Sequence, residues 1–372
     1  MRALPVLCLL LLLSCRQQAA ERSFYYWKNH YESDMSNTLS DSLATSFGIT
    51  HFYVRYLDVD WSEQMQIPVP SSGLGYAASL PSAMAPRYTP VIFITNRVFE
   101  RISDRWCDDS LALKLKAIVD EKTKAINEAY LTTVADKVRP PYVAGQVYNE
   151  DSLRSRLRDS LARSPEEIQI DCDWTVKTRD RYFRFLRSLK KQFPGFAISA
   201  TIRLFPYKYP GKMGVPPVDR GMLMCYNMDR VDNSRARNSV FDLATMKQYL
   251  TDKQYPLPLD AALPVFGWYA WFRGNTLKGI IYPAELGDND LRDHFGNSGN
   301  GYLLHEDYTI GNHYLREGDV LRKEMPEPAA LEEAAQLLQQ QVKGLRRISF
   351  FHWDTRLLNT YDNTIRKIYA TF

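Results

Sequence analysis

Two carboxylates stand two residues apart directly after a short apolar run. Asp171 and Asp173 follow Ile168-Gln169-Ile170, a run typical of a buried strand. Because residues i and i+2 of a strand point to the same side, we expect both acids to face together. Burying two acids is costly unless they are hydrogen-bonded or paired, so their placement at a strand end indicates a use. The alternative is that they are ordinary capping or turn acids.

The elements that position these acids are read from the apolar pattern of the chain. Strands are expected at residues 23–27, 49–57, 89–95, 168–175, 196–202, 221–227, 261–271 and 347–354. Helices are expected at residues 36–47, 111–138, 150–162, 178–192, 241–250, 328–343 and 361–369. Strands alternating with helices predict an α/β fold, a (β/α)8 TIM barrel. A doubly wound open sheet is the alternative, but that fold usually has fewer strands and carries a cofactor loop.

A long segment rich in Gly, Asn and Asp separates the seventh and eighth strands. It covers residues 274–320 and is too long for a simple turn, so it predicts an inserted cap or subdomain. An earlier segment, residues 65–86, is rich in Pro, Ser, Gly and Ala and is expected to form a loop. No internal repeat or linker divides the remainder. Residues 16–372 are therefore expected to form one barrel domain with an insertion.

The first fifteen residues have the pattern of a processed targeting segment. Arg2 precedes an apolar run from Leu4 to Leu13 that is too short for a stable membrane span. The run ends in Leu12-Leu13-Ser14-Cys15, which resembles the bacterial lipobox. By that resemblance residues 1–15 are a lipoprotein signal peptide with Cys15 lipidated, and the mature protein is tethered to the cell envelope. Arg16, where retained inner-membrane lipoproteins carry Asp, favours the outer membrane. The alternative is a plain secretory signal.

Charge and cysteine usage exclude several other classes of function. A net charge of +4 over 372 residues argues against a nucleic-acid partner. Cys107, Cys172 and Cys225 are an odd number of remaining cysteines, so no full disulfide framework is expected. No His and Cys residues have zinc-ligand spacing, and there is no glycine-rich phosphate loop. We therefore expect neither a metal nor a cofactor.

Aromatic and polar residues gather where the expected strands end. In a barrel these carboxyl ends, with the loops after them, build the active face. Aromatic rings stack on the apolar faces of sugars, and carboxylates bind sugar hydroxyls; the alternative for each ring is core packing. The candidate ligand-binding residues are Tyr26, Trp27, Met224, Tyr226, Asn227, Trp268, Trp271, Trp353 and Asp354.

The order and spacing of these motifs resemble the chitinases of glycoside hydrolase family 18. The family's fourth-strand signature D-x-x-D-x-D-x-E is matched in part by residues 168–175, which keep Asp171 and Asp173. Its sixth-strand M-x-Y is present as Met224-Cys225-Tyr226. Its seventh-strand G-x-P-x-Y-G is echoed by residues 264–269, and its final strand's Trp by Trp353. The resemblance spans the first to the eighth expected strand.

The same resemblance exposes a departure at the position of the general acid. The family hydrolyses N-acetylglucosamine linkages, with Asp and Tyr residues that position the substrate's acetamido group; Asp173 and Tyr226 match these. The Glu that protonates the leaving oxygen is replaced by Thr175, and the first Asp of the signature by Ile168. General acid catalysis contributes roughly 10²–10⁴-fold, and a Thr hydroxyl cannot supply it at neutral pH.

Three hypotheses follow for the function. The first is a barrel that recognises a glycan or oligosaccharide at its mouth without the family's catalysis. The second is an active, divergent glycoside hydrolase that uses Asp173, Tyr226 and a further carboxylate about 5–9.5 Å away. Candidates for that carboxylate are Asp171, Asp229, Glu285 and Asp354. The third is a scaffold lipoprotein whose inserted segment binds another protein.

Overall fold

The computed structural model describes residues 19–27, 34–73, 87–138, 149–161, 165–250, 254–287 and 289–372. The expected signal peptide and Cys15 lie outside these ranges. Within the described ranges, no helix combines the length and the apolar character needed to cross a membrane.

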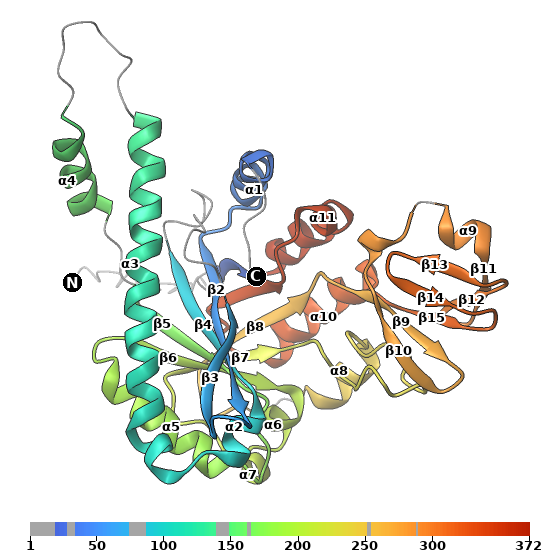
Figure 1. Ribbon diagram of the computed structural model, residues 1–372, viewed down its shortest axis with the longest axis horizontal. Coiled ribbons are helices and arrows are strands. Elements are labelled where there is room, and N and C mark those ends of the chain that lie inside the picture. Colours follow the sequence, from blue (N-terminus) through green and yellow to red (C-terminus); the bar gives the residue numbers. More distant parts are fainter. Residues whose placement is uncertain are drawn as a thin grey trace, which may run out of the picture.

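Eight parallel strands close into a barrel (Figure 1). They are β1 (Glu21–Tyr26), β2 (His51–Ser62), β4 (Tyr88–Ile94), β5 (Glu167–Asp171), β6 (Ala197–Arg203), β7 (Arg220–Met224), β8 (Leu259–Pro264) and β16 (Arg347–Phe351). Each strand pairs with the next, and β1 pairs with both β16 and β2, so the ring has no open edge. The structure confirms the predicted TIM barrel and excludes the open sheet. Strands were expected at all eight of these places.

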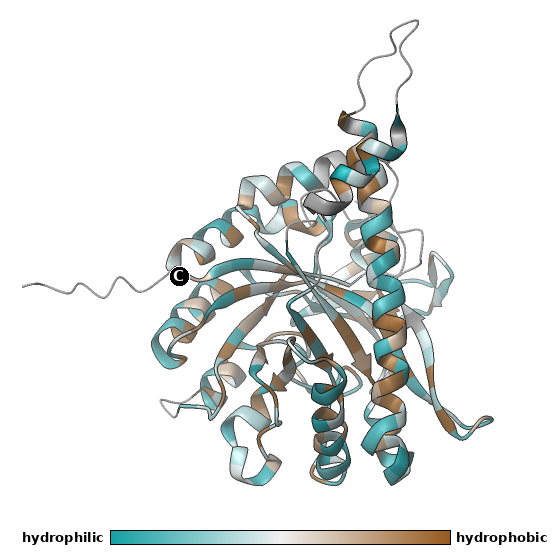
Figure 2. Cartoon of the chain, turned by 90° about the vertical axis from the view of Figure 1, so that its left-hand side faces the viewer, coloured by the Kyte–Doolittle hydropathy of each residue, from teal (hydrophilic) through white to brown (hydrophobic). Residues whose placement is uncertain are grey.

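Most of the helices lie around the ring (Figure 1). The helices are α1 (Asp34–Phe47), α2 (Asn96–Arg101), α3 (Leu111–Val138), α4 (Glu150–Leu161), α5 (Arg179–Gln192), α6 (Leu204–Lys208), α7 (Pro210–Met213), α8 (Leu243–Tyr249), α10 (Pro328–Gln341) and α11 (Thr355–Thr371), and α4 packs against α3. In α5, Tyr182, Phe185, Leu186 and Leu189 are buried, as the pattern predicted. Figure 2 shows apolar and polar residues alternating along α3 beside the strands.

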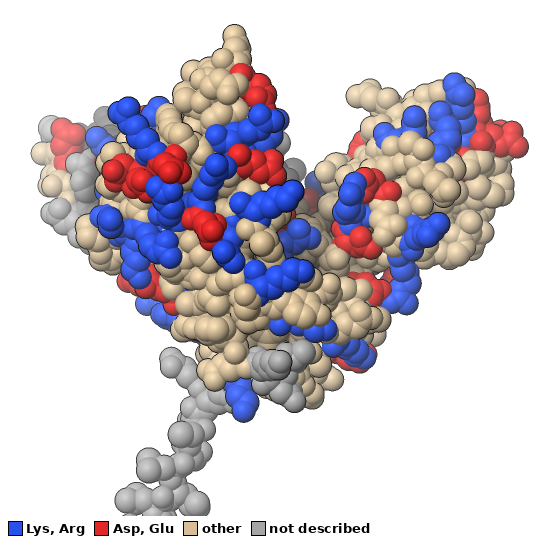
Figure 3. All heavy atoms as spheres, turned by 90° about the horizontal axis from the view of Figure 1, so that it is seen from below, with Lys and Arg blue, Asp and Glu red and all other residues tan. Residues whose placement is uncertain are grey.

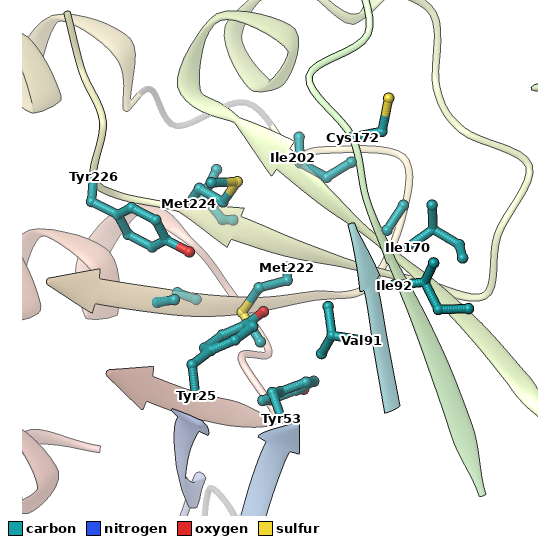
Figure 4. Packing of buried hydrophobic residues seen from close by; sticks show 14 of the residues in the cluster. Tyr25, Tyr53, Val91, Ile92, Ile170, Cys172, Ile202, Met222, Met224 and Tyr226 are labelled. Carbon is teal, nitrogen blue, oxygen red and sulfur yellow. The ribbon is translucent and has the colours of Figure 1, made fainter. Parts of the chain in front are cut away.

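Alternation along each strand separates two sets of buried side chains. Tyr25 and Tyr53 lie inside the barrel, with ring centroids 4.8 Å apart, and Tyr25 Oη donates a hydrogen bond to Gln169 Oε1 at 2.5 Å. Figure 4 shows these two tyrosines side by side within the ring of strands. The intervening residue Phe24 points outward and contacts Phe47 of α1. The barrel interior is therefore a packed core that includes polar groups. Within the barrel, a ligand can bind only at the ends, where the strands terminate.

The segment between β8 and β16 forms a separate lobe (Figure 1). Its five-stranded sheet has the order β10-β9-β15-β12-β11 and encloses its own apolar cluster. The lobe comprises β9 (Trp268–Arg273), β10 (Thr276–Ile281), α9 (Asp290–His294), β11 (Phe295–Ser298), β12 (Gly301–Leu304), β13 (Tyr308–Ile310), β14 (His313–Leu315) and β15 (Val320–Glu324). The sheet is thus wider than the 274–320 segment. The expected seventh strand divides: its first half is β8 and its end, from Trp268, belongs to the lobe.

Other elements also differ from expectation, and the short helices α2, α6 and α7 were not expected. Part of the expected loop at residues 65–86 forms β3 (Ile67–Gly73), which pairs antiparallel with the long strand β2. The terminal helix α11 begins at Thr355, earlier than the expected residue 361. Asp354 caps it, because its carboxylate accepts a hydrogen bond from the backbone N–H of Arg356.

A buried ion pair joins the lobe to the barrel. Arg322 Nε donates to Glu324 Oε1 at 2.7 Å, and both side chains are almost fully buried. Glu324 also accepts hydrogen bonds from Trp268 Nε1 and from Ser239 of the loop after β7. The guanidinium of Arg322 donates to three backbone carbonyls of the same loop, those of Val231, Asn233 and Ala236. The loop between β7 and α8 is therefore fixed to the inserted lobe.

Candidate functional site

A pocket of about 750 Å³ opens where β5, β6 and β7 end. Its walls are residues 174–177 after β5, residues 203–206 and 212–213 at and after the end of β6, residues 226–228 after β7, Glu100 of α2 and Tyr249 of α8. Because these are the carboxyl ends of parallel barrel strands, the pocket occupies the face where such folds place their ligands. Figure 3 views the molecule from the side of α2, α6 and α7.

Asp171 ends β5 and has a buried side chain. Its Oδ1 accepts a hydrogen bond from Thr201 Oγ1 at 2.7 Å. Burial, followed by the charge of the nearby Asp173, raises the pKa of Asp171 to about 7. Near neutral pH this carboxyl is therefore partly protonated, whereas an exposed aspartate is ionised.

Asp173 is in a different environment from Asp171. Half of its side chain is exposed, and its Oδ2 lies 3.5 Å from a guanidinium nitrogen of Arg203. The same guanidinium donates to the backbone carbonyl of Asn227 at 2.8 Å. The acid pair predicted from the sequence is thus at the barrel mouth, with one member buried and the other exposed beside a cation.

Thr175, which the sequence resemblance places where the chitinase family has its general-acid Glu, lines the pocket. Its hydroxyl lies 3.3 Å from that of Thr178, which also accepts a hydrogen bond from the Thr175 backbone N–H at 2.9 Å. Thr178 in turn donates to Asn96 Oδ1 at 2.6 Å. These contacts shape the turn between β5 and α5 and place a hydroxyl, not a carboxyl, at the pocket wall.

Three of the predicted residues are joined by two aromatic rings that sequence reasoning missed. Tyr226 stacks on Phe351 with centroids 4.9 Å apart and meets Phe266 edge-on. Trp27 contacts Phe351 at 5.4 Å, and Trp268 contacts Phe266 at the same distance. Tyr226 and Met224 point inward from the end of β7 in Figure 4. The structure therefore brings Trp27, Tyr226 and Trp268 into one cluster at the mouth.

Three other predicted residues are buried in the protein core. Trp353 is 1% exposed and lies edge-on to Phe24 and Phe52, on the outward side of the strands. Tyr26 is also buried, because alternation from Tyr25 turns it outward. Met224 is 6% exposed and belongs to the same core cluster. These side chains stabilise the barrel and do not present a surface to a ligand.

Two further predicted residues have structural contacts elsewhere. Trp271 lies in the lobe, where its Nε1 donates to Asp319 Oδ2 at 2.8 Å. Asp354 caps α11 and pairs with Arg356 at 3.0 Å. Asn227, by contrast, is exposed and lines the pocket.

An exposed aromatic surface at the pocket was not foreseen. Phe205 is 38% exposed, with its ring 4.9 Å from that of Tyr209 and 6.5 Å from that of Tyr249. Phe205 and Tyr209 follow β6, and Tyr249 ends α8. The run Phe205-Pro-Tyr-Lys-Tyr209 directly after the fifth expected strand was the available signal. Exposed rings beside polar groups suit the stacking of sugars.

Two of the carboxylates considered as catalytic partners, Asp229 and Glu285, are held by other contacts. Asp229 accepts hydrogen bonds from the next backbone N–H and from the Asn233 amide. Glu285 lies in the lobe, where it accepts from a backbone N–H at 2.8 Å. Glu100 is the carboxylate among the pocket's lining residues, and its Oε1 accepts from Asn96 Nδ2 at 3.1 Å.

The next feature is the arrangement of side chains that could bind a metal ion. Among the described residues, no three or more His, Cys, Asp or Glu side chains gather in a way that could hold a metal ion. Cys107, Cys172 and Cys225 are buried free thiols.

Comparisons with known proteins give similar folds at low identity. No protein-family model matches the sequence. No curated protein matches it either. The solved structures that it resembles include the spore cortex-lytic enzyme SleL of Bacillus cereus, at 13% identity and a TM-score of 0.48, over 94% of this chain and 75% of that one.

Two other solved structures belong to the same comparison. A fungal endo-β-N-acetylglucosaminidase of glycosyl hydrolase family 18 is 9% identical with a TM-score of 0.40, over 94% of this chain and 97% of that one. Active domain 2 of a thermostable chitinase from Pyrococcus furiosus is 10% identical with a TM-score of 0.32, over 90% and 85%. With every TM-score below 0.5, the barrel assignment depends on the strand pairings of this chain.

Proposed function

We propose that this protein recognises a glycan at the mouth of its barrel, without the general acid that the chitinase family uses. The observation that carries the proposal is the pocket at the ends of β5, β6 and β7, where exposed aromatic rings stand beside hydrogen-bonding groups. Such a combination suits a pyranose, which has apolar faces and a rim of hydroxyls.

The pocket supplies both kinds of contact. Phe205 and Tyr249 offer ring faces for stacking. Asn227 and Thr175 are exposed and offer an amide and a hydroxyl to sugar hydroxyls, and Tyr226 lies at the inner wall. A pocket of about 750 Å³ is within the range that holds one or two sugar rings.

The absence of a carboxyl at Thr175 argues for binding without turnover. A leaving oxygen needs a proton donor within hydrogen-bond reach, and the Thr175 hydroxyl is not acidic enough at neutral pH. Asp173 lies beside Arg203 with about half of its side chain exposed, so its oxygens can accept hydrogen bonds from a ligand.

A divergent hydrolase is the second candidate, favoured by the raised pKa of Asp171. A carboxyl with a pKa of about 7 beside an acid in a more polar environment is an arrangement suited to proton transfer. In this version Asp171 and Asp173 share the chemistry. The expected result is measurable turnover of some glycan that is abolished by Asp173→Asn, and turnover unaffected by that change would exclude this role for Asp173.

Calorimetric titration tests glycan recognition directly. The purified protein is titrated with chito-oligosaccharides, peptidoglycan fragments and N-glycan fragments, and then Phe205→Ala is titrated with whichever ligand binds. The matched control is Tyr314→Ala, which removes an exposed ring from the lobe. We expect the Phe205 change to weaken binding about tenfold, near 1.4 kcal/mol, and the control to have no effect. No binding to any of these glycans, with capture of a stable protein partner, would favour the scaffold function.

We also propose that Cys15 carries a lipid anchor and that the protein faces the outer membrane of a bacterial cell envelope. The lipobox-like Leu12-Leu13-Ser14-Cys15 and the following Arg16 support this location. Metabolic labelling with a radioactive fatty acid should mark the wild type and fail to mark Cys15→Ser. Labelling of both proteins, or of neither, would contradict the anchor.

A further inference from the structure

The cations of the pocket are not balanced by carboxylates. Its lining contains Lys177, Arg203 and Lys212 but a single acid, Glu100. Figure 3 shows Lys and Arg side chains spread across this face of the molecule. Like charges gathered at one cavity raise its potential and favour an anionic ligand.

The two lysines are available for a ligand. Lys177 is exposed and forms no ion pair or hydrogen bond with any residue that the structure describes. Lys212 has one contact within the same ranges, a cation–π contact in which its ammonium lies 5.6 Å from the centroid of the Phe205 ring. Lys190 and Lys247, on other surfaces, are instead paired with Asp219 and Glu333. The pocket lysines thus differ from these two, because no carboxylate among the described residues compensates their charge.

Two contacts fix the orientation of Arg203, the third cation of the pocket. Its guanidinium donates to the backbone carbonyl of Asn227 and approaches Asp173 at 3.5 Å, so its orientation is fixed before a ligand arrives. Its side chain is 41% exposed, and its planar donors suit carboxylate and sulfate oxygens. Asp173 compensates only part of the positive charge of the group of three cations.

We propose that the glycan recognised here is acidic, with its anionic substituent bound among Lys177, Arg203 and Lys212. The inference rests on the proposed function and narrows its ligand class. The Lys212 ammonium already lies over the Phe205 ring, 5.6 Å from its centroid, so an anionic substituent of a sugar bound at this ring would lie close to a cation. A carboxylate or sulfate at that place forms charge-assisted hydrogen bonds that a neutral chitin chain lacks.

Matched oligosaccharides test the preference. The wild type is titrated with chitotetraose, which is neutral, with a hyaluronan tetrasaccharide, which alternates N-acetylglucosamine with glucuronate, and with O-sulfated chitotetraose. At about 0.02 M salt we expect at least one acidic ligand to bind ~10-fold more tightly than chitotetraose. At about 0.3 M salt that advantage should fall several-fold, because the ion pairs are exposed. The carboxylated and sulfated ligands distinguish which anion the site accepts.

The double variant Lys177→Gln/Lys212→Gln should lose most of this preference, measured as the ratio of its affinities for the acidic ligand and for chitotetraose. Lys191→Gln is the matched control, since Lys191 is exposed at the far end of α5, away from the pocket. Equal affinity for acidic and neutral ligands, or a double variant that keeps the preference, would overturn the acidic-glycan inference and leave the proposed function standing. Failure of all three ligands to bind the wild type would count against the proposed function itself.

Discussion

The two ends of this barrel differ in whether their cationic side chains are paired with carboxylates. At the amino ends of the strands, Arg347 is 6% exposed and donates to Glu21 at 2.7 Å, to Glu167 at 2.5 Å and to the Tyr53 hydroxyl at 3.1 Å. At the carboxyl ends, Lys177 and Lys212 face the pocket without a carboxylate partner among the described residues.

This difference in pairing follows from how far each cation is exposed to solvent. A buried cation is tolerated only with partners, so the base of the barrel surrounds Arg347 with carboxylates. Burial still raises the pKa of Asp260 to about 6 there, although Arg220 and Arg347 act against this. Lys177 and Lys212 at the mouth are exposed to solvent and need no partner. We conclude that the base uses its charges for stability and that the mouth keeps its charges available for a ligand.

The largest effect on stability should come from removing the buried ion pairs of Arg347 at the amino ends of the strands. Arg347→Met leaves Glu167 buried without its cation and leaves Asp260 with Arg220 alone, so we expect the free energy of unfolding to fall by about 3–5 kcal/mol. Urea denaturation measures the change. Arg346→Gln is the control, because Arg346 is exposed next to it, and should cost little. Equal stability of the two variants would contradict the role given to the base.

The ion pair under the lobe should come next. Glu324→Ala removes the acceptor for Arg322 and Trp268, and we expect a loss of about 3 kcal/mol. Because Arg322 also holds the loop at 231–236, hydrogen exchange should accelerate in that loop before it does in β5. If hydrogen exchange accelerates equally in all barrel strands, the ion pair stabilises the whole barrel and not this loop in particular.

Asp171 predicts a pH dependence of stability with a definite sign. Its pKa is raised to about 7 when folded, against about 3.9 when unfolded, so the folded state binds the proton more tightly. Stability from this group is complete below about pH 4 and is lost as pH rises through 7. Between about pH 5 and pH 8 the loss is roughly 2–3 kcal/mol, and Asp171→Asn should remove that part of the slope. An unchanged slope in the variant would mean that Asp171 titrates normally.

The smallest effect is expected at the mouth. Lys177→Gln should leave the melting temperature unchanged within about 1 °C, because its ammonium compensates no charge in the free protein. Differential scanning fluorimetry measures this. A clear loss of stability would show a structural partner for Lys177 and weaken the contrast between the two ends.

Much of the fold could be predicted because parallel barrel strands are buried on both sides and form apolar runs. The boundary between β8 and the lobe could not be predicted, because residues 261–264 and 269–271 are both apolar and buried. Gly267 marks the break: a Cβ there would lie 2.5 Å from the backbone oxygen of Glu324. That close approach comes from a strand more than fifty residues away, which no local pattern contains.

The site was predictable only in part for a related reason. The pair Asp171 and Asp173 follows a clear strand, so its place at the mouth could be inferred from order alone. The aromatic candidates depended on where each strand ends, and an error of one residue turns a side chain to the other face. Phe351, the last residue of β16, faces the mouth, whereas Trp353 lies two residues beyond the strand and faces the core, so alternation could not be extended to it. Phe205 and Tyr249 come from loop and helix ends, whose convergence requires the tertiary fold.

The most direct test of the central claim is the affinity of one glycan for the wild type and for Phe205→Ala, with Tyr314→Ala as control. Phe205 is exposed at the pocket, so its loss should not disturb folding. If the mouth recognises glycan, the dissociation constant rises about tenfold in Phe205→Ala and stays constant in the control. Equal affinity in all three proteins would place glycan binding elsewhere on the molecule and contradict the function proposed for this pocket.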